Sequence, residues 1–117
     1  MTRREINQYN MQERLATFLN DNLDKIKDKP AIISGVQKLS EFNFKIYAMT
    51  HTHRVPSNDG AGTIQRLFHG SRVLINDYLD LLMQPYNTTH PQFYSEYQNA
   101  RTIIDDSVAF AMDAVAI

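Results

Sequence analysis

Residues 63–83, "TIQRLFHGSRVLINDYLDLLM", decide the fold because their apolar side chains recur every three or four positions. That spacing places the side chains on one face of an α-helix, where they can be buried together. The face comprises Ile64, Leu67, Phe68, Ser71, Leu74, Ile75, Tyr78, Leu81 and Leu82. Thr63 can cap the start of the helix, and Pro85 ends it because a residue before proline avoids the α-helical conformation. The stretch therefore predicts an amphipathic helix over 63–83.

Three further segments have the same period, and clusters of helix-breaking residues separate them. They predict helices over about 3–27, 31–50 and 91–115. The alternating polar and apolar runs that are typical of half-buried strands are missing from the sequence. Four amphipathic helices with short connections favour an all-α fold. We predict a single-domain antiparallel four-helix up-and-down bundle over residues 1–117.

Composition narrows the classes of partner. The chain of 117 residues is 43% hydrophobic and 21% charged, and its net charge of −1 gives no general attraction to nucleic acids or anionic membranes. The absence of cysteine excludes disulfides and thiolate metal sites. No window approaches the roughly 18 apolar residues of a membrane span. We therefore expect a cytoplasmic protein that binds neither nucleic acid nor membrane.

The connection over residues 51–62 contains the residues that most resemble a ligand site. His51 and His53 point to the same side if this segment is extended, and Asp59 is then a candidate third metal ligand. The glycines before the helix at 63–83 suggest an anion-binding turn as a second interpretation. Neither a Glu-x-x-His motif nor a phosphate-loop motif is present, however. The interpretation we favour is an exposed, mobile loop that binds no metal or cofactor.

Two asparagines fall among apolar residues, Asn22 in the first predicted helix and Asn43 in the second. A buried amide without a partner costs about 1–3 kcal/mol, so a buried asparagine has to be hydrogen-bonded. We hypothesise that both amides lie near the bundle interior and fix the register of the first two helices. The alternative is that each lies at the edge of an apolar face and reaches water.

The last predicted helix carries a second apolar row beside its main apolar face. Ile103, Phe110 and Ile117 are spaced by seven residues and point away from that face. A helix that is apolar on two sides needs two partners. We predict that this row is an interaction surface, either in a homo-oligomer or with another protein. The alternative is that the chain is a fragment whose natural partner segment is missing.

No catalytic constellation emerges from the sequence. A Ser-His-Asp set is missing, and the neighbouring Asp105 and Asp106 would point about 100° apart on a helix. We therefore predict a non-enzymatic helical-bundle protein without a cofactor, which acts through protein–protein contacts or self-association. The alternative function is a bundle that binds a small ligand, an anion or a metal through the 51–62 loop.

Overall fold

The computed structural model describes residues 2–51 and 60–104, with the side chains of 2–50 and 62–104. Its elements are α1 (Arg3–Asp21), α2 (Leu23–Ile26), α3 (Pro30–His51), α4 (Gly60–Val73), the π-helix η1 (Leu74–Leu79), α5 (Asp80–Met83), α6 (Tyr86–Thr89) and α7 (Pro91–Ala100). Within these described ranges there is no strand, so the predicted all-α class is confirmed.

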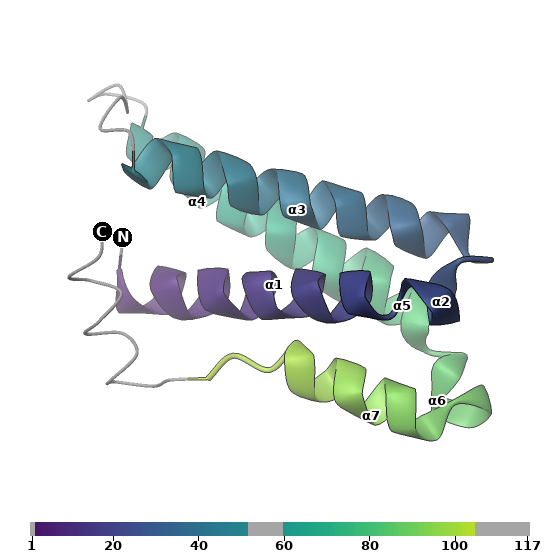
Figure 1. The fold of residues 1–117 in the computed structure, drawn as a ribbon. Helices are drawn as coiled ribbons and strands as arrows, with labels where there is room; N and C mark the ends of the chain where they lie inside the picture. Colours follow the sequence, from purple (N-terminus) through teal and green to yellow (C-terminus); the bar gives the residue numbers. More distant parts are fainter. Residues whose placement is uncertain (1, 52–59, 105–117) are drawn as a thin grey trace.

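The long helices lie side by side in an elongated body of 47 × 29 × 20 Å. Figure 1 shows α1 between α7 on one side and α3 with α4 on the other, and the chain reverses direction between these helices. In that arrangement α1 contacts α3, α4 and α7. The side chains of α1 therefore decide what lies at the centre of the molecule.

The first helix begins with a capping box and breaks before its predicted end at residue 27. The Thr2 hydroxyl accepts from the Glu5 amide at 3.1 Å, and the Glu5 carboxylate accepts from the Thr2 amide at 2.9 Å. At the other end the backbone leaves the helical conformation at Asn22 (φ −119°, ψ 30°), where its amide bonds the Leu19 carbonyl. The predicted helix over 3–27 is thus α1 followed by the single turn of α2.

The helix over 63–83 contains a π-helical turn that the sequence pattern did not predict. Across η1 the hydrogen bonds span five residues, as in the bond from the Asp80 amide to the Ile75 carbonyl. The wider turn takes up one extra residue and rotates the following turns. As a result Leu79 and Met83 are fully buried, whereas Leu81, predicted to lie on the buried face, is 70% exposed.

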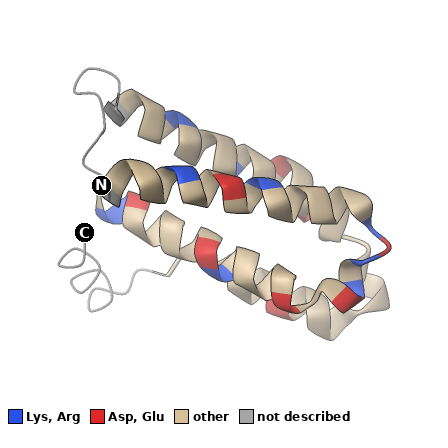
Figure 2. Ribbon diagram, turned by 45° about the horizontal axis from the view of Figure 1, so that its top comes forward, with Lys and Arg blue, Asp and Glu red and all other residues tan. Residues whose placement is uncertain are grey.

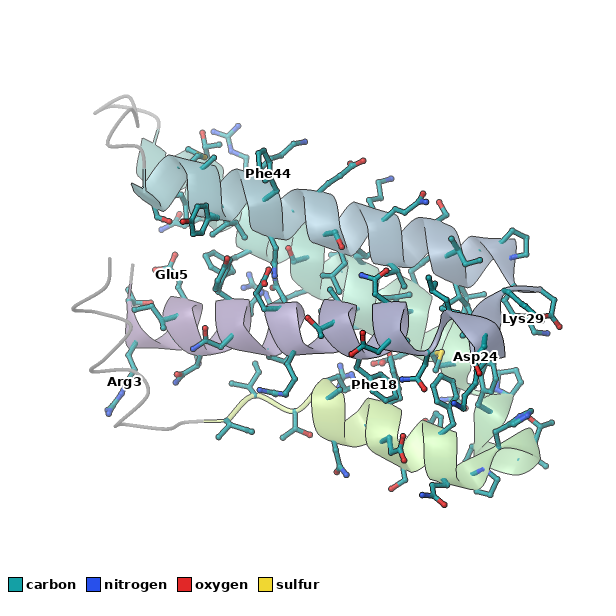
Figure 3. The ribbon with its side chains drawn as sticks, in the orientation of Figure 1. Arg3, Glu5, Phe18, Asp24, Lys29 and Phe44 are labelled. Atoms are coloured by element: carbon teal, nitrogen blue, oxygen red, sulfur yellow. The ribbon has the colours of Figure 1, made fainter. Side chains whose placement is uncertain are left out.

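Aromatic rings fill the core at the end of the bundle where α2 and α6 lie. Phe18 of α1 stacks on Phe93 of α7 with the ring centroids 5.4 Å apart, and Tyr86 meets the edge of Phe93 at 5.1 Å. Figure 3 shows Phe18 pointing from α1 towards α7. The Tyr86 hydroxyl donates to the Lys25 carbonyl at 2.8 Å, which ties α6 to α2. This end of the molecule is held mainly by apolar contact.

The predicted bounds of the connection before α4 are wrong. α3 extends to His51 and α4 begins at Gly60, so the connection is 52–59 rather than 51–62, and Thr63 lies inside α4 instead of capping it. The first turn of a helix has free backbone N–H groups whatever its sequence. Weak helix formers such as Gly60 and Gly62 are therefore tolerated there.

The predicted helix over 91–115 ends early, at Ala100. Arg14 of α1 explains this end: its guanidinium donates from Nε to the Ala100 carbonyl at 3.1 Å and also binds the Thr102 carbonyl. A continuing helix would need the Ala100 carbonyl for the amide four residues later. Residues 101–104 form a turn and an irregular segment, and 105–117 lie outside the described residues.

Candidate functional site

A row of hydrogen-bonded side chains crosses the half of the molecule near the start of α1. Arg72 of α4 donates from Nη1 to Oε1 of Gln8 at 2.9 Å, and Gln8 Nε2 donates to Oε1 of Gln12 at 2.7 Å. Gln12 Nε2 donates to Oδ1 of Asn43 at 2.6 Å. Finally, Asn43 Nδ2 donates to Oε1 of Glu13 at 2.8 Å. We call Gln8, Gln12 and Asn43 the amide relay, because they link a guanidinium to a carboxylate.

The direction of the amide relay follows from the chemistry of its ends. A guanidinium has only donors and a carboxylate has only acceptors, so each amide in between has to accept on the Arg72 side and donate on the Glu13 side. The Phe68 carbonyl reinforces this order, because it accepts from Gln8 Nε2 at 3.1 Å. No single amide can turn over without breaking at least two hydrogen bonds.

The amide relay is shielded from water along its whole length. Gln12 is 0% exposed, and Gln8 and Asn43 are exposed by only 3% and 2%. Buried hydrogen bonds to charged groups are stronger than those between neutral groups, and chains of them polarise one another. The relay therefore joins two charged groups that open on different grooves of the bundle.

Glu13 lines a groove between α1 and α3 with a volume of about 420 Å³. Tyr9 from α1 and Tyr47 from α3 line the same groove, and Tyr47 is 49% exposed. Burial, and then the nearby Glu13 carboxylate, raise the pKa of the Tyr9 phenol from 10.0 to about 12. Tyr9 and Glu13 lie four residues apart on α1 and line the same groove. The groove thus combines aromatic rings with a carboxylate.

Phe44 stands at the rim of this groove and is 72% exposed. Figure 3 shows it on the outer side of α3, pointing away from α1. A large aromatic side chain so open to water is unusual and contributes apolar surface beside the groove.

Arg72 lines a second pocket, of about 320 Å³, at the other end of the amide relay. The pocket lies between α1, η1 and the residues that follow α7. Polar and apolar groups share its wall, which is formed by Gln8, Met11, Arg72, Ile75, Asn76, Arg101, Thr102 and Ile103. Two guanidinium groups and no carboxylate are among these residues, so the pocket is locally positive.

Arg101 is held in place by two groups on the π-turn and its continuation. Its Nη2 donates to Oδ1 of Asn76 at 2.6 Å, and its Nε lies 2.9 Å from Oδ1 of Asp80. The Nε contact is an ion pair without hydrogen-bond alignment, since this buried nitrogen has no aligned acceptor among the described residues. Asp80 also accepts from the Tyr97 hydroxyl at 2.6 Å. Burial and this bond raise the pKa of Tyr97 well above its ordinary value.

A third hollow, of about 440 Å³, lies between α3 and the helix that contains η1. Phe42 and Tyr78 form much of its apolar wall, and Lys38 and Asp77 carry opposite charges around it. Gly35 permits the close approach of the helices, because a Cβ there would lie 2.7 Å from the Leu79 side chain. Because Lys38 and Asp77 carry opposite charges, the hollow favours neither an anionic nor a cationic ligand.

Of the described side chains proposed from the sequence as candidate sites, Asn43 and Ile103 line these hollows and Asn22 does not. The backbone of His51 ends α3, while its side chain, His53 and Asp59 lie outside what the structure describes. Among the described residues no three His, Asp or Glu side chains are grouped to hold a metal. The described helices also include none long and apolar enough to cross a membrane.

The two asparagines differ in their surroundings. Asn43 is buried in the amide relay, whereas Asn22 is half-buried at the break between α1 and α2, away from the interior position expected of it. The Asn22 amide donates to the Phe18 carbonyl at 2.8 Å and accepts from Lys25 Nζ at 2.9 Å. These bonds satisfy backbone and side-chain groups at a helix end, which is the physical reason for its position.

The predicted interaction row is only partly described. Ile103 is 51% exposed, but it follows the end of α7 and so does not belong to a helical face. Phe110 and Ile117 lie outside the described residues. The prediction that the three form a helical surface is therefore wrong for Ile103 and stays a prediction for the other two.

Gln8 and Gln12 were missed by the sequence reasoning, although a signal for them exists. They precede Leu15 and Leu19 by seven residues each, so they continue the same helix face towards the start of α1. Glutamine counts as polar in a hydrophobicity pattern, and this hides its burial.

No protein-family model, curated protein or solved structure matches the chain.

Proposed function

We propose that this protein acts through protein–protein contact, and that the groove between α1 and α3 receives a basic side chain of the partner. The single observation that carries this proposal is the Glu13 carboxylate, which lines the groove with Tyr9 and Tyr47 and has no counter-charge among the described side chains. Among the side chains that the structure describes, no lysine, arginine or histidine pairs with Glu13. Its one recorded partner there is the neutral Asn43 amide.

A basic side chain fits this groove on two grounds. Aromatic rings attract a cation over their faces, by about 0.5–1 kcal/mol at exposed sites and more where water is excluded. A carboxylate adds charge-assisted hydrogen bonding to a lysine or arginine head. The carboxylate oxygen that faces Asn43 is already occupied, which leaves the other oxygen for the partner.

The exposed aromatic side chains of α3 supply the apolar part of the same contact. Phe44 and Tyr47 are 72% and 49% exposed on neighbouring turns. Aromatic residues are enriched in protein–protein interfaces, where they bury large areas at a low cost in side-chain entropy. In the view of Figure 2 acidic and basic residues are interspersed along the helices, so recognition depends on these local groups rather than on a field of one sign.

A peptide-display selection on the whole protein tests the proposal. We expect the selected peptides to share a lysine or arginine, and we expect Glu13→Gln to weaken their binding at least tenfold. Glutamine keeps an oxygen that can accept from Asn43, so this variant should retain the fold. The matched control is Glu41→Gln, an exposed charge removal on α3 outside the groove, which should leave binding unchanged.

Two outcomes would overturn the proposal. One is a set of selected peptides without any enrichment in basic residues. The other is equal binding to the parent protein and to Glu13→Gln. Light scattering on the protein alone distinguishes the kind of partner: a dimer that forms with concentration and is lost in Glu13→Gln identifies the partner as a second copy of this chain.

A further inference from the structure

We propose that the pocket lined by Arg72 and Arg101 binds a small organic anion, a phosphate or a carboxylate attached to an apolar group. This site is distinct from the groove that carries the proposed protein contact, and the inference does not rest on that function. The two ends of the amide relay open on the two sites, Arg72 on this pocket and Glu13 on the groove.

The positive charge of the guanidinium groups in the pocket favours an anionic ligand. Arg72 donates to the neutral Gln8 oxygen, and among the described side chains no carboxylate pairs with it. Arg101 is balanced by Asp80, so within the described part of the chain the charge of Arg72 is the one without a counter-charge in this pocket. A guanidinium presents five donors in a planar fork that matches a carboxylate or a phosphate. Only one Arg72 donor is engaged by a described residue, so donors remain for a ligand.

The other polar groups of the pocket complete a set of donors. Asn76 uses its Oδ1 to accept from Arg101, and its Nδ2 donors have no recorded partner among the described residues. The hydrogen bond to Asn76 and the ion pair to Asp80 hold Arg101 in one orientation. Preorganised donors of this kind bind an anion without losing further side-chain freedom.

The apolar wall indicates an organic anion rather than a bare ion. Met11, Ile75 and Ile103 line the pocket beside the two arginines, and Ile75 is 1% exposed. The volume of about 320 Å³ is at the small end of the range for ligand sites, which begins at about 300 Å³. A phenyl or short alkyl group that carries one anionic head fits these dimensions.

The amide relay provides a specific readout of anion binding, because Gln8 accepts a hydrogen bond from the Arg72 guanidinium that would hold the anion. Drawing Arg72 towards a ligand changes the hydrogen bond to Gln8 and, through it, the bond to Gln12. The side-chain NH₂ resonances of these two residues should therefore shift when the pocket is filled. An anion held by scattered surface charges would not move resonances of such buried groups.

Nuclear magnetic resonance titrations of the whole protein with phenyl phosphate, benzoate and inorganic phosphate test the proposal. We expect saturable shifts of the Gln8 and Gln12 side-chain signals with phenyl phosphate or benzoate, and weaker binding of inorganic phosphate. Comparison of the two organic probes shows which head group is preferred. Arg72→Gln should weaken binding at least tenfold.

Two further variants keep the test decisive. Arg66→Gln removes an exposed charge from the same helix α4 outside the pocket and should leave the affinity unchanged. Arg101→Lys retains a positive charge for Asp80 but not the planar fork, so it should weaken binding without loss of the fold. Equal losses in Arg66→Gln and Arg72→Gln, or no saturable shift with either organic probe at tens of millimolar, would overturn the proposal.

Discussion

The two halves of α1 face the interior with different chemistry. Its later half presents Leu15 and Leu19, both 0% exposed, to the apolar core that also contains Phe93. Its earlier half presents Gln8 and Gln12, equally shielded from water, to a guanidinium and an asparagine. One helix thus buries apolar side chains along its whole length, and in its earlier half it buries amides beside Ile6 and Met11 at similar depth.

The difference shows how stability and specificity are divided along the molecule. Apolar burial stabilises by about 25 cal/mol for each Å² removed from water and tolerates many orientations. A buried hydrogen bond contributes only about 0.5–1.5 kcal/mol net, but it requires one partner in one direction. We therefore expect the apolar half to supply most of the free energy of folding. We expect the amide relay to select the register of α1, α3 and α4.

The largest effect is expected for a truncation in the apolar half, Leu19→Ala. It removes buried methyl groups and leaves a cavity, so the free energy of unfolding should fall by about 3 kcal/mol. Urea denaturation followed by circular dichroism measures this loss. A loss smaller than that of Gln12→Ala would reverse the proposed division between the two halves.

A smaller loss, of about 2 kcal/mol, is expected for Gln12→Ala in the amide relay. The substitution leaves the buried Asn43 oxygen without its donor, and an unsatisfied buried group costs about 1–3 kcal/mol. Replacing Gln8, Gln12 and Asn43 together by leucine should recover part of the loss, because no orphaned amide remains between them. If the triple variant is less stable than Gln12→Ala, the relay contributes more to stability than to register.

The smallest effect concerns the pH dependence of stability at Tyr9. Its pKa is raised from 10.0 to about 12 in the folded protein, so between these values the unfolded chain loses a proton that the folded chain retains. The Tyr9 contribution is therefore fully present below pH 10 and is lost as the pH rises towards 12. Denaturation at several alkaline pH values should show a shallower decline for Tyr9→Phe than for the parent. Parallel curves would contradict the burial of Tyr9 in the groove beside Glu13.

Helical periodicity predicted the class of the fold and the approximate helices, because burial of one face leaves a repeat of three and four residues in the sequence. It failed where the backbone departed from a regular α-helix. The π-turn placed Leu79 and Met83 in the core instead of Leu81, and the Arg14 guanidinium met the carbonyls that end α7. Neither event leaves a local pattern.

The candidate sites were less predictable than the fold for a related reason. Asn43 drew attention because it interrupts an apolar face, but Gln8 and Gln12 extend such a face with polar side chains and were passed over. Glu13 and Arg72 look like ordinary surface charges in a helical pattern. Their roles depend on which helix lies opposite, a question of long-range contact.

The order of apolar residues along the chain determined that this protein is helical, since each helix can bury its stripe by a local rule of spacing. The packing of those helices decided the rest: which amides meet, which carboxylate lines the groove and which arginines share a pocket. Hydrogen bonds and ion pairs act over about 3 Å between residues as far apart in sequence as Gln8 and Arg72. Only the assembled bundle brings such residues within that distance.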